Sequence, residues 1–169
     1  HRHELIGQGF TVNGFCLQED GGFLTTNSQG FWLWQPGEKA VLLAAEAEGQ
    51  ECRLNDCVAD PEGRVYSGSY HLNPDGTSDP SYLFCIDTDG SVRIVDDGIL
   101  FSNGLAFSPD CRTFYFTDLA RRVIYAYDYR RSDGALKNRR PFVRVDRSEG
   151  MPDGVTVDAD GFFWIAHWF

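Results

Sequence analysis

Short stretches of alternating apolar and polar residues, separated by turn residues, run along the chain and predict β-strands. The pattern is clearest between residues 102 and 145, where the tight turns at 108–111 and 132–134 carry Pro, Asp and Gly. We expect four strands in this region, at residues 105–107, 113–117, 122–129 and 140–145. The one helix candidate, residues 38–48, is short and its apolar positions are poorly phased. The chain is therefore predicted to be all-β.

A repeat organises these strands. Each unit has an Asx residue, then Gly or Asp, four further residues, an acidic or Pro-containing turn, and an aromatic strand. The Asx residues are Asn13, Asn55, Asn103 and Asp153, in steps of 42, 48 and 50 residues. A repeat of about 40–50 residues with several short strands is typical of β-propeller blades, each a four-stranded antiparallel sheet. We expect each Asx residue to precede the first strand of its blade.

The chain length limits the number of blades. At roughly 47 residues per repeat, 169 residues supply about 3.6 blades, whereas propellers close with about 4–8. The sequence also ends in an aromatic run, residues 164–169, that reads as an unfinished strand. We therefore expect residues 1–169 to be one partial propeller domain, truncated at both ends. Self-association through its open edges is one way of supplying the missing blades.

Composition excludes several classes of function. No apolar run approaches the roughly 18 residues of a transmembrane helix. The formal net charge of −10, from 15 basic and 25 acidic residues, disfavours binding to nucleic acid or to anionic membranes. The five cysteines are scattered and form no Cys-x-x-Cys pair, which argues against a disulfide framework and a cysteine zinc site. Reduced thiols of this kind favour a cytoplasmic location.

The repeated Asx residues are candidates for a metal site. Equivalent positions of successive blades form a ring, so Asn55, Asn103 and Asp153 are expected to converge at one end of the central channel. Carboxylate and amide oxygens suit Ca²⁺, Mg²⁺ or Mn²⁺ better than a structural zinc site. The alternative is that Asn-Gly, Asn-Asp and Asp-Gly only form turns. For Asn13 we expect only the turn role.

Longer motifs around these positions are more specific. In chain order they include Arg53-Leu54-Asn55-Asp56, Ser102-Asn103-Gly104-Leu105-Ala106-Phe107 and Pro152-Asp153-Gly154-Val155. Together, over roughly residues 10–169, they resemble the family of senescence marker protein (regucalcin), gluconolactonase and luciferin-regenerating enzyme. The resemblance implies a six-bladed propeller with one divalent cation at the mouth of its channel, Ca²⁺ being favoured over Mg²⁺, Mn²⁺ or Zn²⁺. It also implies hydrolysis of a small-molecule sugar lactone.

The resemblance assigns roles residue by residue. Asn103 and Asp153 match metal ligands, and Asp153 also matches the general base. Arg53 and Asn55 match residues that line the substrate pocket. Residues 70–75 take the place of a variable loop near that pocket, so Tyr70 and His71 are candidates for substrate contact.

One expected ligand has no counterpart here. The family's metal site includes a glutamate from a Gly-Glu-x-Pro type motif, which this sequence lacks, and Glu4 lies too close to Asn13 to belong to a preceding blade. We therefore expect the first blade to lie upstream of His1. Two alternatives to a lactonase stay open, namely a non-enzymatic calcium-binding or protein-interaction propeller and an inactive fragment. Arylesterase or phosphotriesterase activity at the same site is a further alternative.

Overall fold

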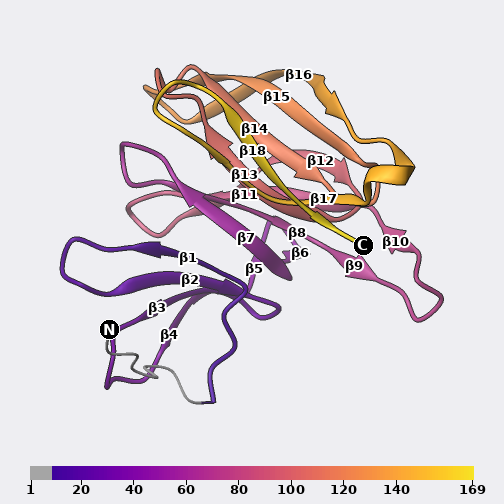
Figure 1. The fold of residues 1–169 in the computed structure, drawn as a ribbon. Helices are drawn as coiled ribbons and strands as arrows, with labels where there is room; N and C mark the ends of the chain where they lie inside the picture. The colour runs from indigo at the N-terminus through magenta and orange to yellow at the C-terminus, as the bar shows by residue number, and fades with distance from the viewer. Residues whose placement is uncertain (1–8) are drawn as a thin grey trace, which may run out of the picture.

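The computed structural model describes residues 9–169, which form an all-β structure (Figure 1). Glu4 lies outside the described residues. Three four-stranded antiparallel sheets follow one another along the chain, and a two-stranded sheet comes after them. Residues 9–169 contain no helix long and apolar enough to span a membrane.

The first sheet contains β1 (Gly14–Leu17), β2 (Phe23–Asn27), β3 (Gly30–Trp34) and β4 (Val41–Ala44). The second contains β7 (Leu54–Ala59), β8 (Val65–Ser69), β11 (Ser81–Ile86) and β12 (Val92–Ile99). The third contains β13 (Ser102–Phe107), β14 (Thr113–Asp118), β15 (Val123–Arg130) and β16 (Ala135–Arg144). The last pairs β17 (Met151–Val157) with β18 (Phe163–Trp168). Two small hairpins add β5 (Glu46–Ala47) with β6 (Gln50–Glu51), and β9 (His71–Leu72) with β10 (Ser78–Asp79).

The prediction of four-stranded antiparallel sheets repeating along the chain is confirmed. The turn at residues 132–134 is also confirmed, and Gly134 there has a φ of 68°, which favours glycine. The fourth strand of the third sheet, β16, begins at Ala135 and not at residue 140. The helix candidate at residues 38–48 contains β4 and β5, because Val41, Leu42 and Leu43 complete the first sheet as its outer strand. Closure into a six-bladed ring stays a prediction.

Two apolar cores hold consecutive sheets together. The first surrounds Phe31, Leu54 and Phe84, and so joins the first sheet to the second. The other surrounds Tyr66, Phe114 and further buried side chains of the second and third sheets. Burial of each aromatic or aliphatic side chain stabilises the folded state by about 1.5–3 kcal/mol. These cores therefore fix how the sheets pack against one another. Figure 1 shows the resulting order of the sheets, from indigo through magenta to orange.

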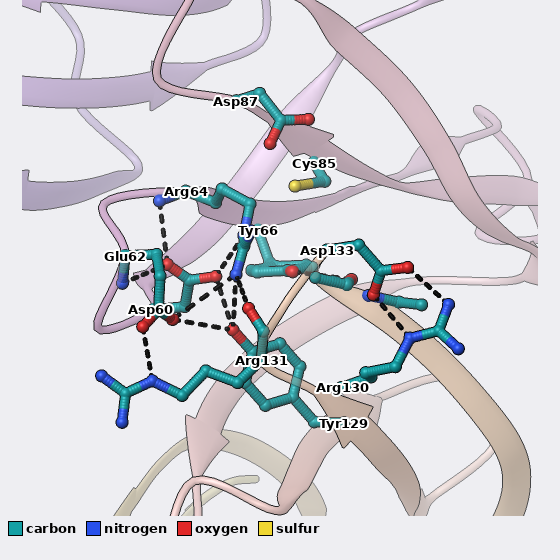
Figure 2. Close-up of polar contacts among 12 residues, drawn as sticks. Asp60, Glu62, Arg64, Tyr66, Cys85, Asp87, Tyr129, Arg130, Arg131 and Asp133 are labelled. Atoms are coloured by element: carbon teal, nitrogen blue, oxygen red, sulfur yellow. Dashed lines mark hydrogen bonds and ion pairs between the residues drawn. The ribbon is translucent and has the colours of Figure 1, made fainter.

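A buried polar cluster also links the second and third sheets (Figure 2). The Asp60 carboxylate accepts hydrogen bonds from Arg64 Nε at 2.6 Å and from the Tyr129 hydroxyl at 2.7 Å. Arg64 Nη2 donates to the Tyr129 hydroxyl at 3.1 Å and to the Arg131 carbonyl at 2.6 Å. The cluster therefore ties the turn between β7 and β8 to the end of β15.

β-Bulges place the Asx residues inside the first strands. The pairing register shifts between Leu54 and Cys57 in β7, between Asn103 and Leu105 in β13, and between Pro152 and Val155 in β17. The expectation that these Asx residues precede their strands is therefore wrong for three of the four, because a bulge lets the strand continue past them. Asn13 does precede β1, and β1 pairs with β2 without a shift.

Candidate functional site

The bulged first strands meet at a cavity of about 710 Å³. It is lined by Asn13, Asn55, Asp56, Tyr70, Leu72, Gly76, Ser78, Phe101, Asn103, Leu119, Ala120, Met151, Asp153 and Trp168. The predicted convergence of the Asx residues at one place is therefore confirmed, although their spacing along the chain is 42 to 50 residues. A bulge re-aims a side chain and interrupts pairing, which explains why three bulged strands present polar groups to one cavity.

Two of the asparagines also link neighbouring sheets through hydrogen bonds. Asn13 Nδ2 donates to the carbonyl of Leu54, and Asn55 Nδ2 donates to the carbonyl of Ser102, both at 2.9 Å. Each acceptor is the residue immediately before the next Asx position. Because this bond uses one N–H of Asn55, its side-chain oxygen and its second N–H stay available to the cavity. The amides therefore have a structural role, which is not the turn role that the dipeptides suggest.

The glycines beside the Asx residues allow the first strands to come close. A Cβ atom on Gly104 would lie 2.5 Å from the backbone nitrogen of Val155 and 2.6 Å from the carbonyl oxygen of Asp153. Gly14 is similarly close to the backbone of Cys57, at 2.8 Å. Neither glycine has a positive φ. The repeated Asn-Gly pairs therefore serve close packing between strands, and a side chain at Gly104 would push Asp153 away.

Two carboxylates face the cavity, and only Asp153 is a residue to which the sequence assigned a role. Burial, and secondly the negative charge of Asp153, raise the pKa of Asp56 to about 6. None of the residues that line the cavity, all within 9–169, is Lys or Arg. The cavity therefore concentrates negative charge without a cationic side chain to offset it. Asp56 follows Asn55 directly in the chain, so its position beside a predicted site residue was the sequence feature that could have identified it.

Part of the cavity lining is apolar and aromatic. Tyr70 and Phe101 stack with ring centroids 4.8 Å apart and planes at 21°. An isolated β-bridge joins the same two residues, which fixes the stack between the second and third sheets. Phe101 and Trp168 also line the cavity, and sequence reasoning assigned neither of them to the site. A cavity that combines aromatic rings with carboxylates and amides can hold a ligand that has both apolar C–H surface and oxygen atoms.

Two predicted substrate-binding residues do not line this cavity. The side chain of Arg53 is exposed, and its carbonyl accepts a hydrogen bond from the backbone nitrogen of Tyr70 at 3.2 Å. His71 in β9 lies with Nδ1 3.2 Å from Ser81 Oγ. His71 follows Tyr70 in the chain, and Arg53 contacts the backbone of Tyr70. Both therefore neighbour a residue that lines the cavity, although neither lines it. Their roles toward a substrate stay predictions.

The oxygen donors of the cavity are mixed in type. Asn103 is buried, and its Oδ1 accepts the backbone N–H of Gly104 at 2.9 Å, which holds the side chain in place. Asn55 contributes an amide and the two aspartates contribute carboxylates. Within residues 9–169, no group of three or more His, Cys, Asp or Glu side chains is arranged to hold a metal ion. Any cation here would therefore need the amide oxygens as well as the two carboxylates, a donor set that suits hard cations.

Comparisons with known proteins agree on one family. A family model described as "SMP-30/Gluconolactonase/LRE-like region" matches residues 4–169. Pentonolactonase XacC of Haloferax volcanii is 35% identical over 98% of this chain and 55% of its own length. Regucalcin of Danio rerio is 31% identical over 88% of this chain and 51% of its own length.

A solved structure gives the same result. XC5397 of Xanthomonas campestris, described as a gluconolactonase, superposes with a TM-score of 0.78 and 25% identity. The superposition covers 92% of this chain and 56% of that one. The chain thus spans about half the length of the relatives it matches.

Proposed function

Because the chain belongs to the SMP-30/gluconolactonase/LRE-like family, we propose that its 710 Å³ cavity is a site of sugar-lactone hydrolysis. One observation carries the proposal. Asp56 and Asp153 face a cavity that also presents asparagine amides, and none of its lining residues within 9–169 is Lys or Arg. The names pentonolactonase and gluconolactonase, borne by similar proteins, support the substrate class.

The residues present fit a divalent cation. The raised pKa of Asp56 reflects burial and the nearby charge of Asp153, and a cation would relieve both costs. Asn103 and Asp153 would hold the ion, with Asp56 and the amide of Asn55 available beside them. Hard oxygen donors favour Ca²⁺, with Mg²⁺, Mn²⁺ and Zn²⁺ as alternatives. When bound, the cation would supply polarisation of the lactone carbonyl and stabilisation of the negative charge that develops on its oxygen.

In this proposal Asp153 accepts the proton and later donates it. A water molecule attacks the carbonyl carbon, and Asp153 takes a proton from that water as the new C–O bond forms. The ring C–O bond then breaks, and the same proton passes to the leaving oxygen, which becomes the hydroxyl of the open-chain acid. Asp153 returns to its starting state. Asp56 adds a second carboxylate to the lining of the cavity.

The aromatic part of the cavity lining orients the substrate. The stacked rings of Tyr70 and Phe101 suit the C–H face of a sugar ring, because such faces pack against aromatic surfaces. The amide of Asn55 also lines the cavity, and it can pair with hydroxyl groups there. A pocket that pairs with hydroxyls rejects lactones lacking them. Arg53 and His71 would act from the rim.

The proposal is tested by titrating the acid released from D-glucono-1,5-lactone and from a pentonolactone, with each of the four cations added separately. Asp153→Asn should lower the rate by about 10²-fold or more and weaken cation binding measured by calorimetry. Asp160→Asn, an exposed site in the turn before β18, is the matched control and should change neither. Hydrolysis that is equal in both variants would refute the assignment. Cation binding that depends on Asp153, with no hydrolysis of any lactone, would instead indicate the non-enzymatic alternative.

A further inference from the structure

Two cysteines that are far apart in the chain lie side by side between the first and second sheets. Cys16 is in β1 and Cys57 is in β7, 41 residues later, and their Sγ atoms are 3.7 Å apart. Both are free thiols and both are partly exposed. The close approach of Gly14 to the backbone of Cys57 holds the two strands at this distance. The pair is therefore built into the strand packing.

The other three cysteines have different surroundings. Cys52 and Cys85 are 1% and 0% exposed, and burial raises the pKa of their thiols to about 12 and about 11. Cys111 lies in a surface turn, and the structure gives it no cysteine neighbour among residues 9–169. Only Cys16 and Cys57 combine proximity with access, since Cys57 also lines a second cavity of about 260 Å³ with Asp56 and Gly104.

The two thiols share one hydrogen bond, in which either sulfur can be the donor. Neither side chain is fully buried, so hydrogen peroxide can reach the pair. Either sulfur can therefore act as the nucleophile, because the Sγ atoms are 3.7 Å apart and both side chains are partly exposed. This is the usual arrangement of an attacking cysteine beside a resolving cysteine.

We propose that Cys16 and Cys57 form an oxidation-sensitive pair that closes to a disulfide between β1 and β7 when the protein meets hydrogen peroxide. One of the two thiols loses its proton, the thiolate attacks one peroxide oxygen, the O–O bond breaks, and that cysteine becomes a sulfenic acid while the departing hydroxide takes up the proton as water. The sulfur of the other cysteine then attacks the sulfenic sulfur, the S–S bond forms, and the sulfenic hydroxyl leaves as water with the proton of that second thiol. Two thiols and one hydrogen peroxide thus give one disulfide and two waters.

The disulfide would act on the cavity described above. Cys57 immediately follows Asp56 at the β-bulge of β7, so a covalent link at Cys57 restrains the strand that carries Asn55 and Asp56. The link would also hold the first sheet on the second, and the 41-residue separation makes the closed loop long enough to raise the melting temperature by about 10 °C.

The experiment is a thiol map of the 169-residue protein before and after hydrogen peroxide. Trypsin cleavage after Lys39, Arg53, Arg64, Arg93 and Arg112 puts each of the five cysteines on its own peptide. Peptides are alkylated under denaturing conditions and identified by mass spectrometry. We expect one cross-linked species that joins the Cys16 and Cys57 peptides and lacks two hydrogen atoms, while the other three cysteines stay alkylated. Dithiothreitol should reverse it.

Variants separate this pair from unspecific oxidation. Cys16→Ser and Cys57→Ser should each abolish the cross-link, and Cys111→Ser should leave it intact. The wild-type map decides the question even where a variant fails to fold. The proposal is overturned if Cys16 and Cys57 stay alkylated under conditions that oxidise Cys111, or if either of them is cross-linked to a different cysteine. The result does not depend on lactone hydrolysis.

Discussion

Replacement of Arg64 by methionine tests how much the polar cluster between the second and third sheets contributes to stability. Methionine keeps an unbranched stem and removes the charge. Four interactions are lost: the pair with Asp60 at 2.6 Å, the longer pair with Glu62 at 3.4 Å, and the hydrogen bonds to the Tyr129 hydroxyl and the Arg131 carbonyl. The Asp60 side chain, with 0% exposure, then stays buried without its cation.

The expected cost follows from this geometry. Removing one partner of a buried ion pair destabilises a protein by about 3–5 kcal/mol, because the remaining charge is uncompensated. Asp60 keeps three donors in the variant, namely the backbone nitrogens of Glu62 and residue 64 and the Tyr129 hydroxyl. We therefore expect the lower end, about 3 kcal/mol, which corresponds to a fall in melting temperature of about 6–12 °C.

Urea unfolding followed by tryptophan fluorescence measures this loss as a lower midpoint at unchanged slope. Arg131→Ala is the matched control, because Arg131 pairs with Glu62 while its side chain is 61% exposed. Such surface pairs contribute about 0–1 kcal/mol. Adding Asp60→Asn to Arg64→Met should recover part of the loss, since a carboxamide needs no counter-charge. The reasoning is refuted if Arg64→Met costs no more than Arg131→Ala.

Two further predictions concern the cavity. Asp56 has a folded-state pKa of about 6 against an ordinary value of 3.8, so the folded state holds the extra proton and stability falls as pH rises from about 4 to about 6. Asp56→Asn should remove that fall in urea unfolding measured at several pH values; a fall that persists would implicate another group. Gly104→Ala should destabilise the protein by about 1–3 kcal/mol, because its Cβ would lie 2.5 Å from the backbone nitrogen of Val155. Gly154→Ala, whose Cβ would meet no atom within 4 Å, should cost little, and equal losses would contradict the packing argument.

The repeat made the sheets predictable. Strands β14 and β15 begin and end within one residue of their expected positions, because turn residues and alternation both mark their ends. The outer strands were harder to delimit. β16 is largely exposed, so its polar residues Lys137 and Asn138 carry no alternation that would reveal a strand. β4 was mistaken for weak helix for a related reason, since Val41, Leu42 and Leu43 are all exposed.

The site was predictable in outline and not in detail. Equal positions in a repeat converge, so Asn55, Asn103 and Asp153 could be grouped without coordinates. The hydrogen-bond partners of each residue and the direction of its side chain depend on the bulges, and a bulge has no fixed sequence pattern. Asp56 illustrates this limit. In a regular strand successive side chains point to opposite faces, which would turn Asp56 away from the side that Asn55 faces. Because the register shifts between Leu54 and Cys57, both side chains reach the cavity.

The same bulge explains why one chain position serves both packing and chemistry. A regular β7 would pair with β8 along its whole length, and its backbone hydrogen bonds would all lie within the second sheet. The interruption after Leu54 frees the Asn55 amide to bond across to Ser102, and it exposes the Asp56 carboxylate to the cavity. It also brings Cys57 within 3.7 Å of Cys16 on the preceding sheet. One backbone irregularity therefore sets the positions of three neighbouring side chains: the Asn55 amide that bonds to the next sheet, the Asp56 carboxylate at the cavity, and the Cys57 thiol beside Cys16. A deletion that restored the regular register would be expected to lose all three together.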